Sequence, residues 1–179
     1  YGGQSVNISH LGKYVRKSYE KFKEEFGGVT SKEILDKKIK EEVTSGVQTL
    51  QYQINTLMTT NGRSPLVSFF MYLREGEEYI KENALIIEEI LKQRIEGMKD
   101  EEGKYINPEF PKLIYVIDEN NCLNGGKYDY LTHFALECAN KTQEPSFISA
   151  KKMRENYEGN VFSCMGCRSF LSPWKDENG

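Results

Sequence analysis

The sequence predicts an α/β fold, because strands of the buried type alternate with amphipathic helices along the chain. Two continuous apolar runs, at 66–73 and 112–119, are typical of strands covered on both faces, as in parallel sheets. A helix is expected between them at 77–98, and another at 128–141 leads to a short strand at 145–149. These intervals imply parallel crossovers and a ligand site at the carboxyl edge of the sheet.

Two long helices are expected before the first of these strands. Residues 6–26 and 32–58 repeat apolar side chains at intervals of three or four, and glycines between them favour a helix end. Ser31 is in position to cap the second helix. Helices joined by a short connection pack as an antiparallel pair. Their apolar stripes exceed what one hairpin can bury against itself, which predicts a two-fold dimer surface.

Composition narrows the class of protein. With 179 residues, length alone suggests one domain, and a net charge of −3 gives no electrostatic case for nucleic acid or an anionic membrane. No apolar run reaches the roughly eighteen residues of a membrane span. Four cysteines in a chain of this length favour a reducing, cytoplasmic setting over a disulfide scaffold. A start inside Tyr-Gly-Gly-Gln and a stop at Asn-Gly suggest a piece of a longer protein.

A polar turn at 59–64 precedes the first apolar strand. Asn61, Gly62 and Ser64 within it offer amide, backbone and hydroxyl groups that could bind a nucleotide phosphate or ribose. A purely structural turn, held by its own hydrogen bonds, explains the same residue types. The residues alone leave both interpretations open.

Two acidic residues, Asp118 and Glu119, stand where the second apolar strand ends. Carboxylates at a strand end invite a metal or acid–base hypothesis. Adjacent residues of a strand point to opposite faces, however, so the two carboxylates are not expected to share one site. No metal is predicted in this segment.

The last twenty residues carry the most distinctive pattern, Cys164-Met-Gly-Cys167 between the apolar pairs Val161-Phe162 and Phe170-Leu171. Such a segment suits a loop inserted into a protein interior, with Gly166 permitting a tight backbone beside Cys167. Half of a zinc site, a redox pair and two buried small side chains are the alternatives. No second ligand pair is present for zinc, and the flanks do not match a redox pair at a helix N-terminus.

Several blocks of the chain together resemble the anaerobic (class III) ribonucleotide reductases. Residues 165–171, Met-Gly-Cys-Arg-Ser-Phe-Leu, with 172–179 after them, are similar to the radical-cysteine loop of that family. Residues 148–160 resemble the approach to the loop, and 48–62 and 1–5 resemble earlier blocks in the same order. The resemblance covers nearly the whole chain.

The resemblance implies a fold and a division of the chain. It implies a ten-stranded α/β barrel, of which this chain carries part of one catalytic domain. Residues 1–58 would form the helical dimer and effector region, 59–159 the barrel segment, and 160–179 the central finger loop. Cys167 matches the thiyl radical cysteine of the family, whereas Cys164 does not.

The resemblance also implies an activity, cofactors and partners. The intact enzyme would reduce ribonucleotides to deoxyribonucleotides as a homodimer, with a glycyl radical that lies outside this segment. A radical S-adenosylmethionine activase would install that radical, and ATP and deoxynucleotides would act as effectors. The segment by itself is expected to be inactive. The competing hypothesis is a noncatalytic α/β module whose cysteine pair packs or binds metal and whose helical hairpin mediates association.

Overall fold

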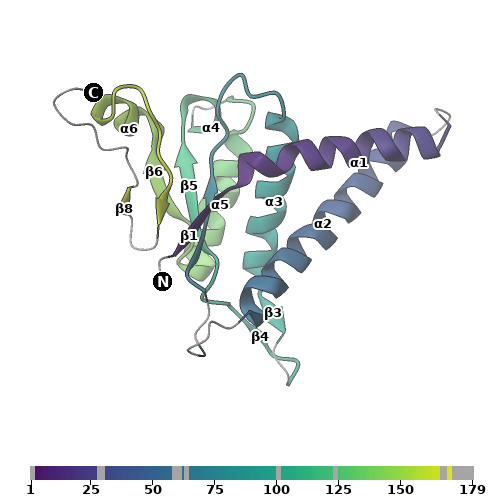
Figure 1. Cartoon of the computed structure of the whole chain (residues 1–179), viewed down its shortest axis with the longest axis horizontal. Helices are drawn as coiled ribbons and strands as arrows, with labels where there is room; N and C mark the ends of the chain where they lie inside the picture. Colours follow the sequence, from purple (N-terminus) through teal and green to yellow (C-terminus); the bar gives the residue numbers. More distant parts are fainter. Residues whose placement is uncertain are drawn as a thin grey trace.

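The computed structural model describes residues 3–27, 31–57, 62, 65–99, 102–122, 125–165 and 169–170 (Figure 1). The elements of the first part are β1 (Gln4–Asn7), a 3-10 helix (Ile8–Leu11), α1 (Gly12–Glu25), α2 (Lys32–Thr56), β2 (Val67–Met71) and α3 (Ile80–Glu96). Those of the second part are β3 (Met98–Lys99), β4 (Tyr105–Ile106), β5 (Lys112–Ile117), α4 (Glu119–Cys122), α5 (Asp129–Thr142), β6 (Ser146–Ser149), α6 (Ala150–Asn156), β7 (Cys164–Met165) and β8 (Ser169–Phe170).

A four-stranded parallel sheet forms the centre, in the order β1-β2-β5-β6. The spatial order follows the chain order without reversal, so each connection moves the chain one strand further in the same direction. Crossovers of one hand then place their helices on one face of the sheet. The predicted α/β class and its parallel strands are therefore confirmed, in the form of a sheet that is wound on one side.

The strands bury both of their faces, and alternate residues enter different cores. In β2, Phe69 and Met71 join a core with α2, α3 and α5, whereas Phe70 points into a second core. In β5, Leu113 enters the first core and Ile114 the second. This alternation explains why both strands read as continuous apolar runs.

The second core lies between the sheet and the C-terminal segment. Ala150 and Met153 of α6 and Cys164 of β7 are buried there against the strands. Figure 1 shows α6 and β8 on the opposite side of the sheet from α3. Helices α2, α3 and α5 cover one face of the sheet, and α6 and β7 cover the other.

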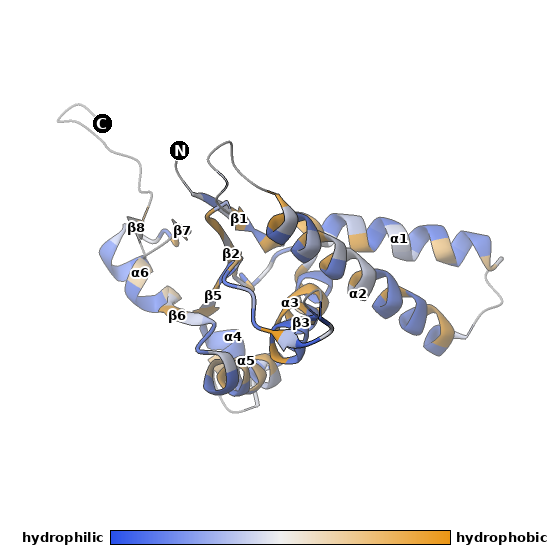
Figure 2. Ribbon diagram, turned by 90° about the horizontal axis from the view of Figure 1, so that it is seen from below, coloured by the Kyte–Doolittle hydropathy of each residue, from blue (hydrophilic) through white to orange (hydrophobic). Residues whose placement is uncertain are grey.

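Helices α1 and α2 project from the sheet as a hairpin, which Figure 2 shows extending away from the strands. The apolar stripe of α2 is largely buried within the chain, where Ile39, Val43 and Val47 share the core with α3. Less apolar surface is therefore left for a partner than the sequence predicted. What remains is a groove of about 330 Å3 between α1 and α2, whose lining includes Leu11, Tyr14, Val15 and Leu50.

Several predicted boundaries were wrong for identifiable reasons. The helix expected over 6–26 begins at Gly12, because Gln4–Asn7 pairs with β2 as a fourth strand. Asn7 precedes the 3-10 turn and caps it by accepting a hydrogen bond from the Ser9 N–H at 3.1 Å. Ser31 occupies the N-cap of α2, yet its side chain accepts no capping hydrogen bond.

The connections also contain more regular structure than the sequence predicted. The short helix α4 follows β5, where no helix was expected, and the connection between α3 and β5 carries the β3–β4 hairpin. Among the helices of the described ranges, none combines the length and the apolar character needed to span a membrane.

Candidate functional site

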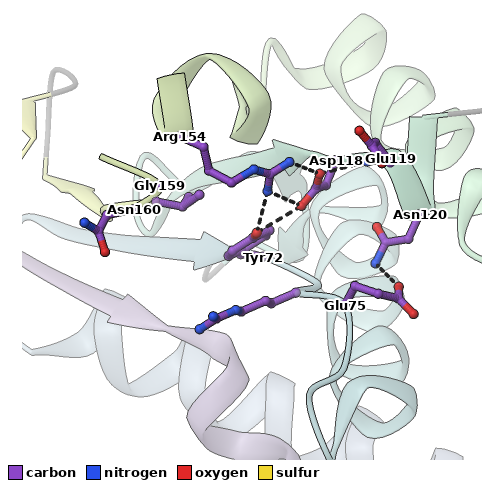
Figure 3. Close-up of a pocket in the computed structure, with 10 residues that line it drawn as sticks. Tyr72, Glu75, Asp118, Glu119, Asn120, Arg154, Gly159 and Asn160 are labelled. Carbon is purple, nitrogen blue, oxygen red and sulfur yellow. Dashed lines mark hydrogen bonds and ion pairs between the residues drawn. The ribbon is translucent and has the colours of Figure 1, made fainter. Parts of the chain in front are cut away.

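An open cavity of about 640 Å3 lies at the carboxyl edge of the sheet, the edge where the strand pattern predicts ligands. Its walls come from the ends of β2 and β5, from α6 and from the turn before β7 (Figure 3). The lining residues are Tyr72, Arg74, Glu75, Asp118, Glu119, Asn120, Arg154, Gly159, Asn160 and Val161.

A cluster of Asp118, Arg154 and Tyr72 forms one wall of this cavity. The Arg154 guanidinium donates from Nη2 to Asp118 Oδ1 at 2.7 Å and from Nη1 to Asp118 Oδ2 at 2.8 Å. The Tyr72 hydroxyl donates to Asp118 Oδ2 at 2.9 Å and accepts from Arg154 Nη1 at 3.2 Å. Figure 3 shows Arg154 reaching from α6 toward both partners. A two-pronged pair of this kind fixes orientation as well as charge.

The protonation states in the cluster follow from these contacts. The Arg154 guanidinium, through its hydrogen bonds, holds the pKa of Asp118 below its usual range. Burial, together with the hydrogen bond to Asp118, raises the pKa of Tyr72 to about 12. At neutral pH the carboxylate is therefore charged, and the tyrosine keeps the proton that it donates.

The backbone around Asp118 is held by the start of α4. Asn121 accepts from the Asp118 N–H at 2.8 Å and donates to the Val116 carbonyl at 3.0 Å. Asn120 reaches across to the end of β2, donating to the Leu73 carbonyl at 2.8 Å and to Glu75 at 3.1 Å. Asn121 therefore holds the turn from β5 into α4, and Asn120 joins that turn to the end of β2.

Strand alternation, on which the expectation for Asp118 and Glu119 rested, does not hold for this pair. Both line the cavity, because the strand ends at Ile117 and Glu119 already begins α4, so strand alternation does not apply to them. Within the described residues no group of three or more His, Cys, Asp or Glu side chains is placed to hold a metal ion.

A tight turn carries the chain from α6 into β7. Glu158 and Gly159 both adopt positive φ, at 52° and 83°, and the Gly159 N–H donates to the Arg154 carbonyl at 2.8 Å. Asn160 closes the turn by donating from its side-chain amide to the Tyr157 carbonyl at 3.0 Å. This hydrogen-bond pattern is that of a helix C-cap with a left-handed residue, and it sends the chain back over the sheet.

Strand β7 lies on the second core and pairs with β8 in an antiparallel ladder. Cys164 is opposite Phe170, is fully buried and belongs to the second core. The Tyr157 ring contacts the rings of Phe162 and Phe170, with centroids 5.6 and 6.0 Å apart. These contacts join the segment before β7 to β8. Cys167 lies in the sequence between the two strands, outside the described residues.

The other predicted site residues remain largely untested. Asn61 and Ser64 lie outside the described residues. Gly62 is exposed with φ of 68°, and no described atom lies within 4 Å of the position that a Cβ would take. The proposed nucleotide-binding role of the 59–64 turn therefore stays a prediction. Sequence reasoning missed Tyr72 and Arg154 as site residues.

An all-parallel sheet with a cavity at its carboxyl edge is the arrangement of an α/β enzyme. The sequence matches the family model of the anaerobic ribonucleoside-triphosphate reductases over residues 1–179, and the chain belongs to that family. It is 35% identical over 187 residues to the anaerobic ribonucleoside-triphosphate reductase of Enterobacteria phage T4, and 33% identical over 186 residues to that of Escherichia coli K12. Both alignments cover 100% of this chain, but only 30% of the phage protein and 25% of the bacterial one.

The lowered pKa of Asp118 predicts a specific pH dependence of stability. A carboxylate whose pKa is depressed on folding contributes stability above its unfolded pKa of about 3.9, and that contribution is lost as pH falls through the folded value. Asp118→Asn in the intact protein should cost about 1–3 kcal/mol at pH 7, because it removes a charged hydrogen-bond acceptor. Chemical denaturation from pH 7 down to pH 3 should show this cost constant above about pH 5 and shrinking below pH 4.

The matched control is the same substitution made in an Arg154→Gln background, where the guanidinium no longer depresses the Asp118 pKa. There the cost of Asp118→Asn should be smaller and nearly independent of pH. A cost that is independent of pH in the presence of Arg154 would contradict the assignment.

Proposed function

We propose that the intact protein is an anaerobic ribonucleoside-triphosphate reductase, which removes the 2′-hydroxyl of ribonucleotides to supply DNA precursors. The observation that carries the proposal is the family match over the whole chain, including the segment that contains Cys167. The chain spans about a quarter to a third of its curated relatives, so the activity belongs to the complete protein rather than to this segment. The segment alone is proposed to be inactive.

Cys167 is the proposed radical residue. It follows the end of β7 by two residues and precedes β8 by two, and β7 packs into the core on the face opposite the helices. In the proposed chemistry the Cys167 thiyl radical takes the hydrogen atom from C3′ of the ribose and becomes a thiol. The resulting substrate radical then loses the 2′-hydroxyl as water, with the proton supplied by the 3′-hydroxyl. Two electrons and two protons from a reductant outside this segment, and return of the hydrogen atom from the Cys167 thiol, complete the deoxyribonucleotide. Closeness to the sugar and exclusion of solvent are the two requirements, and a segment that packs in a protein interior is suited to both.

The sheet is proposed to form one side of a ten-stranded barrel. A sheet wound on one side leaves its second face free of crossover helices, which is the condition for curving into a barrel with that face inward. In this arrangement residues 59–159 supply barrel strands and 160–179 supply the finger inside. Residues 1–58, which also contribute the edge strand β1, form the dimer and effector region.

The proposed cofactor is a glycyl radical elsewhere in the protein, installed by a radical S-adenosylmethionine activase. It would supply the unpaired electron that Cys167 uses in each turnover. Effector ATP and deoxynucleotides are proposed for the region around the helical hairpin. Asn61, Gly62 and Ser64 remain a proposed contribution to nucleotide binding, supported by their side-chain chemistry and their position before β2. A cytoplasmic setting, where thiols stay reduced, accompanies this chemistry.

The radical assignment is tested by two serine variants of the intact enzyme. Cys167→Ser should abolish nucleotide reduction, because an oxygen radical is not accessible at that site, whereas the glycyl radical should still be installed. Cys164→Ser should keep measurable turnover, with some loss of stability because it places a hydroxyl in the second core. Deoxynucleotide formation and the electron paramagnetic resonance signal are the measurements. Equal loss in both variants, or activity in the first, would refute the assignment.

A homodimer is proposed to form at the α1–α2 groove. Tyr14 lines this groove and is 55% exposed, and covering such an apolar surface with a second copy is the commonest solution. Tyr14→Glu should therefore shift the intact protein toward monomer in sedimentation at micromolar concentration. Leu136→Glu is the control, because Leu136 is 52% exposed but lies on α5, away from the groove. Monomeric wild-type protein would rule out the dimer.

A further inference from the structure

Helix α6 is the segment through which the fold holds the approach to Cys167. It follows β6 directly, and the turn after it leads within a few residues into β7. Ser149 caps it by accepting from the Lys152 N–H at 3.3 Å, and Met153 is buried in the second core. The ion pair between Lys152 and Glu155 is exposed and stays within the helix, so it does not attach α6 to the sheet.

Arg154 makes the polar attachment of α6 to the sheet. Its guanidinium is bound by Asp118, 36 residues earlier, and by Tyr72, 82 residues earlier, at the carboxyl ends of two neighbouring strands. The Asp118 side chain is 10% exposed and that of Arg154 is 35% exposed, so the pair is partly shielded from water and salt. A shielded, two-pronged pair resists both rotation and translation of the helix.

The backbone of the same residue holds the entry to the finger. The Arg154 carbonyl accepts the hydrogen bond from the Gly159 N–H at 2.8 Å, and this bond closes the turn with two positive φ angles. Arg154 therefore binds the strand ends through its side chain. Through its main chain it binds the turn that directs the chain over the second core. Both terminal guanidinium nitrogens are already engaged, so Arg154 is less suited to capture a ligand anion than to hold structure.

We propose that Arg154 is a positioning residue for the radical cysteine, acting through its pair with Asp118 and its contact with Tyr72. The inference rests on the proposed function, since it assigns Arg154 to the placement of Cys167 against the ribose. Loss of the pair lets α6 and the following turn shift relative to the strand ends. Displacement of a reacting group by about 1 Å is sufficient to cost on the order of 100-fold in rate.

The test uses the complete enzyme after activation and compares variants of the cluster. Arg154→Gln and Asp118→Asn each remove the ion pair, and Arg154→Lys keeps the charge without the fork. Tyr72→Phe removes the two hydrogen bonds of the tyrosine hydroxyl but leaves the ion pair. Glu155→Gln is the matched control, because it breaks an exposed ion pair on the same helix without touching the strands. For each protein, kcat, KM for the nucleotide and the glycyl radical content are measured.

Arg154→Gln and Asp118→Asn should lower kcat roughly 10- to 100-fold, with KM and glycyl radical content within about twofold of wild type. The double variant should have a kcat no lower than that of the more impaired single variant, because both substitutions remove the same interaction. Arg154→Lys and Tyr72→Phe should fall between wild type and Arg154→Gln, and Glu155→Gln should match wild type. If Arg154→Gln or Asp118→Asn does not fold, the kcat values of Arg154→Lys and Tyr72→Phe decide whether Arg154 is a positioning residue.

Variants with wild-type kcat would overturn the positioning role while leaving the proposed function intact. A parallel fall of kcat and glycyl radical content would also overturn it, because that result indicates general destabilisation. An activated wild-type protein that reduces no nucleotide would refute the proposed function itself. The wild-type measurement therefore separates failure of the function from failure of the inference.

Discussion

The sheet has to be buried on both faces, and this requirement determines the arrangement of every other element. Phe69 and Phe70 are neighbours in β2 that enter opposite cores, and they are 0% and 2% exposed. Burying a side chain of this size contributes about 1.5–3 kcal/mol, so exposing either face would cost many times that amount over the strands. Helices α2, α3 and α5 cover one face, because one-sided winding leaves them there.

The second face is covered by α6 and β7, and this gives the C-terminal segment a structural role in the fold. Cys164 is buried in that core, and the residues that follow β7 include Cys167. Apolar packing holds such a segment against the sheet, but packing alone does not fix its position along the strands. The bond from Arg154 to Asp118 adds that directional restraint at the strand ends.

Local patterns predicted the elements that dominate the fold. The apolar runs gave β2 and β5, and the three-or-four periodicity gave α2, α3 and α5. The four-residue strand β1 was missed, because it is short and directly precedes the helical spacing that begins with Ile8 and Leu11. Its identity depends on pairing with β2, about sixty residues away in the chain. Short strands of this kind are decided by tertiary contacts rather than by their own sequence.

The site was predictable only where a local signal existed. Asp118 stood out as a carboxylate at a strand end, but its partner Arg154 is one of many basic residues and has no distinguishing neighbour in the sequence. Tyr72 was hidden in an apolar run, where an aromatic ring is expected to be core. Asp118 and Glu119 line the same cavity because the strand ends at Ile117, two residues before the end of the predicted 112–119 strand.

The central claim is that the sheet face opposite the helices becomes the interior of the catalytic chamber. An experimental structure of the intact protein, determined to a resolution that shows side chains, tests it most directly. The account predicts that the face bearing Phe70, Ile114 and Ile148 is enclosed by further strands of the same chain, with Cys167 inside the enclosure. A structure in which helices other than α6 cover that face, or in which Cys167 lies at the outer surface, would contradict it.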